Sequence, residues 1–451
     1  MKHKLIGMIH YIFLFIFFFC TIQFFCAAFK GDSLYNYGFS YAVSRGEIPY
    51  KDFNMIIPPF GAFFYALPFL LFSHSYIIFN VTQAFLLCVF FHLLYKMYGK
   101  KAYLLLIFMV GIYPFPFISV IFPGYNFLLL MELLLLIYFE SFKKNDYEIG
   151  LLLGISLLTK QTVGFCFLLV SFYYGFSDIQ KLGKRLIGMS IPVLVFLIYL
   201  LLTKSLDAFM DHCFLGMFDF TSKNGRVMDI YFVLFILGMI LLLWFIRKNH
   251  KDLTYYYILA FSSIAVPLFD YYHVSLFLFS LLWIGIPHIP ISYSKKEIII
   301  FSSILSLVSV LTFSYLFYHP MDIVYSKFPN FEGVLMERKI WEGNKRIRQF
   351  IEENRNENLI ILGNNAYFYK ISSELEINHY DLLNYGNHGK NGTQKIIEKL
   401  KKEEKPIFIF GLVEYQETSD RQQLNKEVMK YVLEHYPEKR KIGSYLILEG
   451  G

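Results

Sequence analysis

The run Tyr76–Tyr95, YIIFNVTQAFLLCVFFHLLY, decides the fold class of this chain. It is apolar over about 20 residues, the length that an α-helix needs to cross a hydrocarbon core of about 30 Å. Similar runs recur over the first 318 positions, and 56% of the 451 residues are hydrophobic and 20% aromatic. An average soluble domain is about 45–50% apolar. The sequence therefore predicts a polytopic α-helical membrane protein.

Outward from this run, we expect about eleven membrane spans. The first covers about 5–29 and stays uncleaved, because its apolar stretch is longer than the apolar core of a signal peptide. The run 60–72 follows Pro58-Pro59 and is too short to cross alone. The other expected spans lie at about 102–121, 125–142, 147–159, 161–177, 186–203, 228–246, 253–269, 274–291 and 298–318.

Basic residues set the expected orientation. Cytoplasmic turns of membrane proteins are enriched in Lys and Arg, and basic clusters occupy alternate turns of this chain: Lys96/Lys100/Lys101, Lys143/Lys144, Lys181/Lys184/Arg185, Arg247/Lys248/Lys251 and Lys295/Lys296. We therefore expect a multi-pass protein of the plasma membrane with its N-terminus in the cytoplasm and its C-terminus outside. The net charge of +7 belongs to these turns and gives no reason to expect nucleic-acid binding.

The character of the chain changes after residue 318, which predicts two domains, 1–318 in the membrane and 319–451 outside it. Short apolar runs at 358–362, 406–412 and 444–448 alternate with helix-like stretches near 341–355, 393–404 and 422–436. This alternation predicts a small α/β domain with a partly parallel sheet. The segment 204–226 is expected to be amphipathic and interfacial on the same outer side.

The first outer loop, 29–61, carries the first candidate site residues: Asp32, Arg45 and Asp52. A carboxylate at the membrane boundary can act as a general base toward a hydroxyl or amine, and we assign that role to Asp32. The alternative is that Asp32 caps a helix that begins at Ser33. Asp52 either orients a substrate or pairs with Lys51 or Arg45.

Lys160 is the most informative single charge, because apolar sequence lies on both sides of it. A lysine inside a membrane segment costs about 2.5–3.5 kcal/mol on insertion scales and suggests a function. A phosphate partner would account for it, with hydrogen bonds from Gln161, Thr159 and Thr162. The alternative is a lysine at a helix end that reaches the interface.

Three further groups are candidates for ligand binding on the outer side: Tyr125 and Asn126 after Pro123-Gly124, and His273 after Asp270. His212, beside Asp211, is a weaker candidate. The alternative for each of these residues is a structural role, as a cap or a packing residue of a helix. The five cysteines lack metal-ligand spacing, and the absence of an Asp-x-Asp motif gives no support for a metal-held nucleotide-sugar donor.

Four motifs of the membrane part, about 1–318, resemble the GT-C superfamily of membrane glycosyltransferases, which includes protein O-mannosyltransferases and aminoarabinose transferases. They are Gly31-Asp32-Ser33 with the stretch 45–53 and Pro58-Pro59, Pro123-Gly124-Tyr125-Asn126, the stretch 157–164 (LLTKQTVG), and Asp270-Tyr271-Tyr272-His273. Many relatives carry Asp-Glu in the first loop, where this chain has Asp32-Ser33.

The resemblance implies a sugar donor linked to polyprenyl phosphate, inversion at the sugar carbon, and no required divalent metal. Asp32 would activate the acceptor, a cell-envelope glycan, lipid or protein, and Lys160 and His273 would neutralise the leaving lipid phosphate. Two other functions remain open: a transporter or flippase of lipid-linked glycans, and a membrane-anchored binding protein that works through 320–451. The absence of an internal repeat disfavours the transporter.

Overall fold

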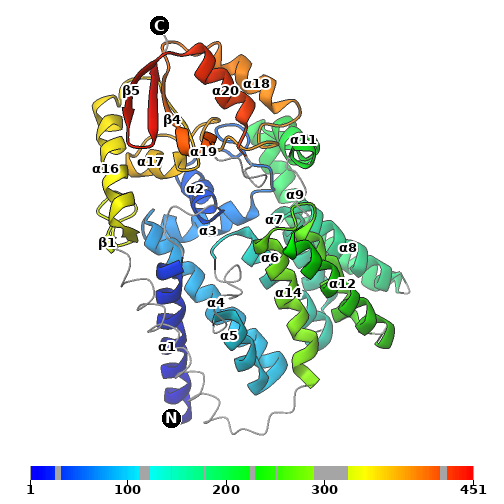
Figure 1. Cartoon of the computed structure of the whole chain (residues 1–451). Helices are drawn as coiled ribbons and strands as arrows, with labels where there is room; N and C mark the ends of the chain where they lie inside the picture. The colour runs from blue at the N-terminus through cyan, green and yellow to red at the C-terminus, as the bar shows by residue number, and fades with distance from the viewer. Residues whose placement is uncertain are drawn as a thin grey trace. The chain divides into compact units, whose positions relative to one another are not determined.

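The computed structural model of the chain describes residues 2–25, 32–110, 122–143, 145–176, 178–223, 229–249, 252–288, 323–416 and 424–449 (Figure 1). Most of these residues are helical, and a small mixed sheet lies in the C-terminal part, as predicted. The expected span 298–318 and the second half of the expected span 102–121 lie outside the described residues.

The apolar helices overlap the expected runs. They are α1 (Lys2–Phe25), α4 (Tyr76–Tyr98), α5 (Ala102–Val110), α6 (Tyr125–Tyr138), α7 (Asp146–Thr159), α8 (Gln161–Gly175), α9 (Ile179–Thr203), α12 (Ile230–Lys248), α13 (Leu253–Phe261) and α14 (Tyr271–Gly285). Their ends, however, differ from the expected ones by up to eight residues: α9 begins at Ile179 and not near 186, and α13 ends at Phe261 and not near 269. Polar side chains fix several of the starts. Asn145, Asp229, Asp252 and Asp270 each accept a hydrogen bond from a backbone N–H in the first turn of the helix that follows.

By length and composition, four helical segments among the described residues could each cross a membrane: Tyr76–Leu106, Tyr125–Lys143, Ile179–Thr203 and Ile230–Lys248. Only 17% of the most apolar stretch is buried in each of the last two, which suits helices that face lipid. This is the pattern of a multi-pass membrane protein. The total of eleven spans and their orientation stay predictions.

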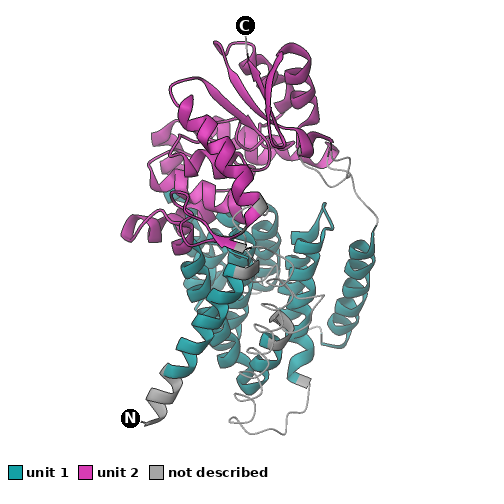
Figure 2. Cartoon of the chain, turned by 60° about the vertical axis from the view of Figure 1, so that its left-hand side comes forward, with its two compact units in different colours: residues 1–26, 79–196, 226–320 teal, residues 27–78, 197–225, 321–451 magenta. Residues whose placement is uncertain are grey.

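Packing divides the chain into two compact units, coloured separately in Figure 2. Unit 1 comprises Met1–Cys26, Phe79–Phe196 and Arg226–Pro320, and unit 2 comprises Ala27–Ile78, Leu197–Gly225 and Met321–Gly451. The sequence predicted two consecutive domains with a boundary at 318/319. In the structure, however, the earlier segments Ala27–Ile78 and Leu197–Gly225 pack with the C-terminal part. Both of these segments include sequence that we expected on the outer side.

The core of unit 1 is made by aliphatic and aromatic side chains of its helices. Phe90 of α4 and Phe279 of α14 contact Trp283, and all three are buried. α7 and α8 approach each other closely, because Gly164 has no side chain: a Cβ there would lie 2.4 Å from the backbone nitrogen of Leu157. This glycine therefore permits the tight pair that frames Lys160.

In unit 2 the first outer loop folds into two packed helices, α2 (Asp32–Ser44) and α3 (Phe60–Leu71). The aromatic residues Tyr37, Phe39 and Tyr41 of α2 are buried in this unit. They are core residues and leave no aromatic face for a membrane. With 12 residues, α3 is about 18 Å long and too short to cross a bilayer, as expected.

The segment 204–226 also belongs largely to unit 2. It contains α10 (Leu206–Met210), a π-helical turn (Asp211–Leu215) and α11 (Gly216–Lys223). Met210, Phe214 and Phe218 are exposed, whereas the polar side chains point to the C-terminal part through the ion pairs Asp211–Lys395 at 2.6 Å and Lys223–Glu427 at 2.7 Å. The segment therefore has one apolar and one polar side.

The C-terminal sheet has the strand order β3-β4-β6-β5. Its strands are β3 (Leu359–Leu362), β4 (Ile407–Gly411), β5 (Glu438–Ile442) and β6 (Tyr445–Glu449). β3 and β4 are parallel, and the other two pairs are antiparallel, which confirms a partly parallel sheet. The expected helical stretches are α16 (Arg338–Glu353), α18 (Gly392–Leu400) and α20 (Lys426–His435).

Five short elements of the C-terminal part were not expected from the sequence, among them α19 (Leu412–Gln416) directly after β4. The strand β5 reads EKRKI and carries no apolar signal, because it lies at the sheet edge where charged side chains discourage pairing with other chains. The hairpin of β1 (Ile323–Tyr325) and β2 (Leu335–Glu337) has strands of only three residues. α17 (Ala366–Ser372) is fully buried, so it lacks the polar face by which helices are recognised.

Candidate functional site

Lys160 is the single residue between α7 and α8. Its backbone is extended, with φ −153° and ψ 112°, so the chain turns a corner there between two apolar helices. Because α8 begins directly after Lys160, the first backbone N–H groups of α8 open at the same corner as the lysine. Such N–H groups and a positive side chain both favour an anion.

Tyr125 and Lys160, two of the candidate site residues, lie together. Lys160 Nζ is 5.8 Å from the centroid of the Tyr125 ring, a cation–π distance. Tyr125 is the first residue of α6, which starts after Gly124, whose φ of 148° is rare for any residue but glycine. The next residue, Asn126, has a buried Oδ1 that accepts no hydrogen bond from any described residue.

His273 and Asp270 form a hydrogen-bonded pair at the start of α14. His273 Nδ1 lies 2.9 and 2.8 Å from the two oxygens of Asp270, and the backbone N–H of His273 donates to the same carboxylate at 3.0 Å. The His273 side chain is 6% exposed. The carboxylate fixes the orientation of the ring, so only the second ring nitrogen can interact elsewhere.

Lys160 is electrostatically coupled to this pair. Burial alone would raise the pKa of Asp270, but the His273 ring, the hydrogen bonds from His273 and the charge of Lys160 outweigh it and lower the pKa to about 2. The structure thus brings together three predicted site residues of unit 1: Lys160, Tyr125 and His273. Gln161, the first residue of α8, lies at the same corner.

Asp32 lies in unit 2, whereas Lys160 and His273 lie in unit 1. The pocket that these three residues are expected to share therefore stays a prediction. Asp32 is exposed in the first turn of α2, where a negative charge is favourable toward the helix dipole. The local role suggested as an alternative, stabilising the start of a helix, fits this position and is compatible with catalysis.

Asp52 and Arg45 both make local contacts. Asp52 Oδ2 accepts a hydrogen bond from the backbone N–H of Ile48 at 2.7 Å and closes the turn 48–52, and it forms no ion pair with Lys51 or Arg45 among the described contacts. Arg45 is exposed and donates to the hydroxyl of Tyr41 at 3.0 Å, one turn earlier in α2. Neither contact requires a substrate.

A cluster of buried acids in unit 2 was missed by the sequence analysis. Burial raises the pKa of Glu47 to about 7, with Arg45 opposing the rise, and burial raises the pKa of Asp381 to about 6 against the attraction of Lys370, 4.0 Å away. The Tyr367 hydroxyl is buried near both carboxyls and has no hydrogen-bond partner among the described residues. No local pattern marks these positions, because their burial depends on distant segments.

His212, the weaker candidate, lies in a group of buried histidines in unit 2. Burial lowers the pKa of His212 to about 4 and that of His388 to about 3, so both are neutral at pH 7. Asn54 of the first loop joins the group: its Nδ2 lies 2.7 Å from His388 Nδ1 and its Oδ1 lies 2.7 Å from His379 Nδ1. Among the residues that the structure describes, no such group could hold a metal ion.

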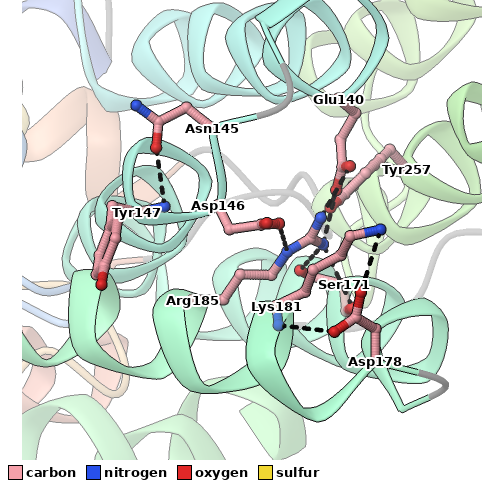
Figure 3. Close-up of polar contacts among 9 residues, drawn as sticks. All are labelled: Glu140, Asn145, Asp146, Tyr147, Ser171, Asp178, Lys181, Arg185 and Tyr257. Atoms are coloured by element: carbon pink, nitrogen blue, oxygen red, sulfur yellow. Dashed lines mark hydrogen bonds and ion pairs between the residues drawn. The ribbon is translucent and has the colours of Figure 1, made fainter.

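A buried ion network in unit 1 surrounds Arg185, which the sequence analysis used only as a cytoplasmic charge (Figure 3). Its guanidinium donates to both oxygens of Glu140 at 2.8 and 3.0 Å, to Asp146 at 2.9 Å and to the Ser171 hydroxyl at 2.7 Å. Tyr257 also donates to Glu140, at 2.9 Å. These contacts join several helices of unit 1. Because the hydrogen-bonding groups of Arg185 are occupied by protein partners, the network has little capacity to bind a ligand.

Comparison with protein-family models gives no match for this chain, and comparison with curated proteins gives none either. The resemblance to membrane glycosyltransferases therefore rests on the motifs alone.

Proposed function

We propose that the chain is an inverting glycosyltransferase that moves a sugar from a polyprenyl-phosphate carrier to a cell-envelope acceptor at the outer face of the membrane. The observation that supports this proposal is the corner at Lys160, where a cation, the start of α8 and the Asp270–His273 pair meet within one compact unit. Among the described residues, Lys160 is the one cation that by itself joins two apolar helices; Lys100 and Lys101, between α4 and α5, form a 3₁₀ turn together with Gly99.

The chemistry explains why a cation is needed at that place. In the transfer, the bond between the sugar carbon and the phosphate oxygen breaks while the acceptor oxygen forms its bond from the opposite face. The phosphate leaves with the bonding electrons, so negative charge grows on it in the transition state. A fixed positive side chain and oriented N–H groups stabilise such charge far better than water does in a site that excludes it.

The acceptor must lose a proton in the same reaction, and we assign that proton to Asp32. Asp32 is exposed at the start of α2, so its carboxylate is accessible to a hydroxyl or amine. The carboxylate takes the proton as the acceptor attacks and returns it to water afterwards. Proton transfer of this kind contributes typically 10²–10⁴-fold to a rate.

The proposal is tested with purified protein in lipid vesicles, labelled polyprenyl-phosphate sugars and an envelope extract. We expect wild-type protein to transfer label, Asp32→Asn to abolish transfer, and Lys160→Gln to reduce it strongly. Asp32→Asn keeps the size of the side chain and removes a charge that is favourable at the helix start, an effect of about 0.3–1 kcal/mol. Folding should therefore survive.

The matched control is Asp207→Asn, since Asp207 is also exposed in the first turn of a helix of unit 2. This variant should transfer at the wild-type rate. Full activity of Asp32→Asn would remove Asp32 from its role. Failure of wild-type protein to transfer any of the lipid-linked sugars would overturn the proposal itself.

A further inference from the structure

Glu132 is an acidic residue in the interior of a candidate membrane span. It lies in α6 within Tyr125–Lys143, between Met131 and Leu133, and 4% of the residue is exposed. Acidic side chains are rare at such depth, and an ionised carboxylate there needs a cation or several donors. Among the described residues, no Lys, Arg or His compensates Glu132, and its Oε2 has no hydrogen-bond partner.

Two hydroxyls of α7 lie close to the Glu132 carboxyl: that of Ser156 and that of Thr159, the last residue of the helix. The Ser156 hydroxyl donates to the backbone oxygen of Leu152 at 2.9 Å, so its proton is already used. Thr159 Oγ1 lies 2.6 Å from Glu132 Oε1 and also 3.0 Å from the backbone oxygen of Ile155. A threonine hydroxyl has one proton to donate and can accept through its lone pairs. With an ionised Glu132, this single proton would face two acceptors.

If Glu132 is protonated, each of the two short contacts of Thr159 Oγ1 can be a hydrogen bond with its own proton. The carboxylic acid donates from Oε1 to Thr159 Oγ1, and the Thr159 hydroxyl donates to the oxygen of Ile155, so each short contact has its own proton. The separation of 2.6 Å is typical of a short O–H···O bond. The neutral form also avoids the cost of an unpaired buried charge.

The hydrogen bond between Glu132 and Thr159 also bears on the position of the neighbouring Lys160. Lys160 follows Thr159 directly, and the Lys160 side chain contacts the Tyr125 ring of α6. α6 thus holds the corner between α7 and α8 at two points, through Tyr125 and through Glu132. We propose that Glu132 is a protonated carboxylic acid that donates to Thr159 and so positions Lys160, whatever ligand that corner binds.

Infrared spectroscopy of the protein in lipid tests the protonation. At pH 8, Glu47 and Asp381, with pKa values of about 7 and 6, are mostly ionised. We expect the carbonyl stretch of a protonated carboxylic acid in wild-type protein and its loss in Glu132→Gln. Glu140→Gln is the matched control, because Glu140 forms an ion pair with Arg185; this variant should keep the band. A band that is absent from wild type, or unchanged in Glu132→Gln, overturns the proposal.

A nitroxide label at position 160, introduced as Lys160→Cys in a protein whose five native cysteines are replaced by alanine, tests the positioning. Glutamine is neutral and can still donate to Thr159, so Glu132→Gln should keep the label as immobile as it is on the Lys160→Cys background. Glu132→Ala and Thr159→Val should each increase its mobility. Equal mobility in all variants would show that the bond does not position the corner. Should Glu132→Ala fail to fold, the Thr159→Val and glutamine variants decide.

Discussion

Replacing Arg185 with methionine tests how unit 1 is held together. The Arg185 side chain is 6% exposed, and those of Glu140 and Asp146 are 9% and 11% exposed. Arg185→Met fits the volume but leaves two buried carboxylates without their cation. Breaking a buried ion pair in this way costs about 3–5 kcal/mol, because the remaining charge is uncompensated. For a unit of this size, the loss lowers Tm by roughly 6–20 °C.

The assay is thermal unfolding of purified protein at one fixed heating rate, since membrane proteins often unfold irreversibly. Lys181→Met is the matched control: it removes the Lys181–Asp178 ion pair, which spans 3.5 Å and has side chains 57% and 41% exposed. Exposed pairs of this kind contribute about 0–1 kcal/mol, so Tm should hardly change. If Arg185→Met changed Tm no more than Lys181→Met does, the network would contribute nothing and the reasoning would be refuted.

Two further predictions concern unit 2. Gly38→Ala should destabilise it by about 1–3 kcal/mol, because a Cβ at this position would lie 2.2 Å from the Tyr367 ring; chemical denaturation checks this, and an unchanged midpoint would contradict it. Burial raises the pKa of Asp381 from 3.8 to about 6, so about 3 kcal/mol of stability is present below pH 4 and lost as the pH rises to 6. Asp381→Asn should remove that loss. Burial lowers the pKa of His388 from 6.5 to about 3, so stability falls by about 3 kcal/mol as the pH drops from 6.5 to 4. Because these two slopes oppose each other between pH 4 and 6, each is measured as the difference between a variant and wild type in unfolding experiments from pH 4 to 8. His388→Gln should lose less stability than wild type as the pH falls from 6.5 to 4. A variant with the same pH dependence as wild type would refute the assignment of the residue that it replaces.

Hydropathy and helix-end signals were enough to place most helices. The corner at Lys160 falls where the sequence breaks two apolar runs, and Asp270 starts α14 as a capping residue does. These features depend on neighbouring residues only. The aromatic side chains of the first loop show the limit of such reasoning, because Tyr37 and Tyr41 are core residues of unit 2. Hydrophobic periodicity and composition do not distinguish an aromatic side chain that packs in a core from one that contacts a ligand.

The sequence by itself determined that the chain is largely helical, which apolar stretches become helices, and where a partly parallel sheet forms near the C-terminus. Only the tertiary structure decided which polar groups are buried and what they meet. Glu132 and Thr159 are 27 positions apart, and Asn54 and His388 are 334 apart. Helix formation follows from local hydrogen bonds and the cost of exposing apolar surface, so it is encoded locally. The charge state of a buried side chain depends on the partners and the water that folding gives or removes, and no local pattern records these.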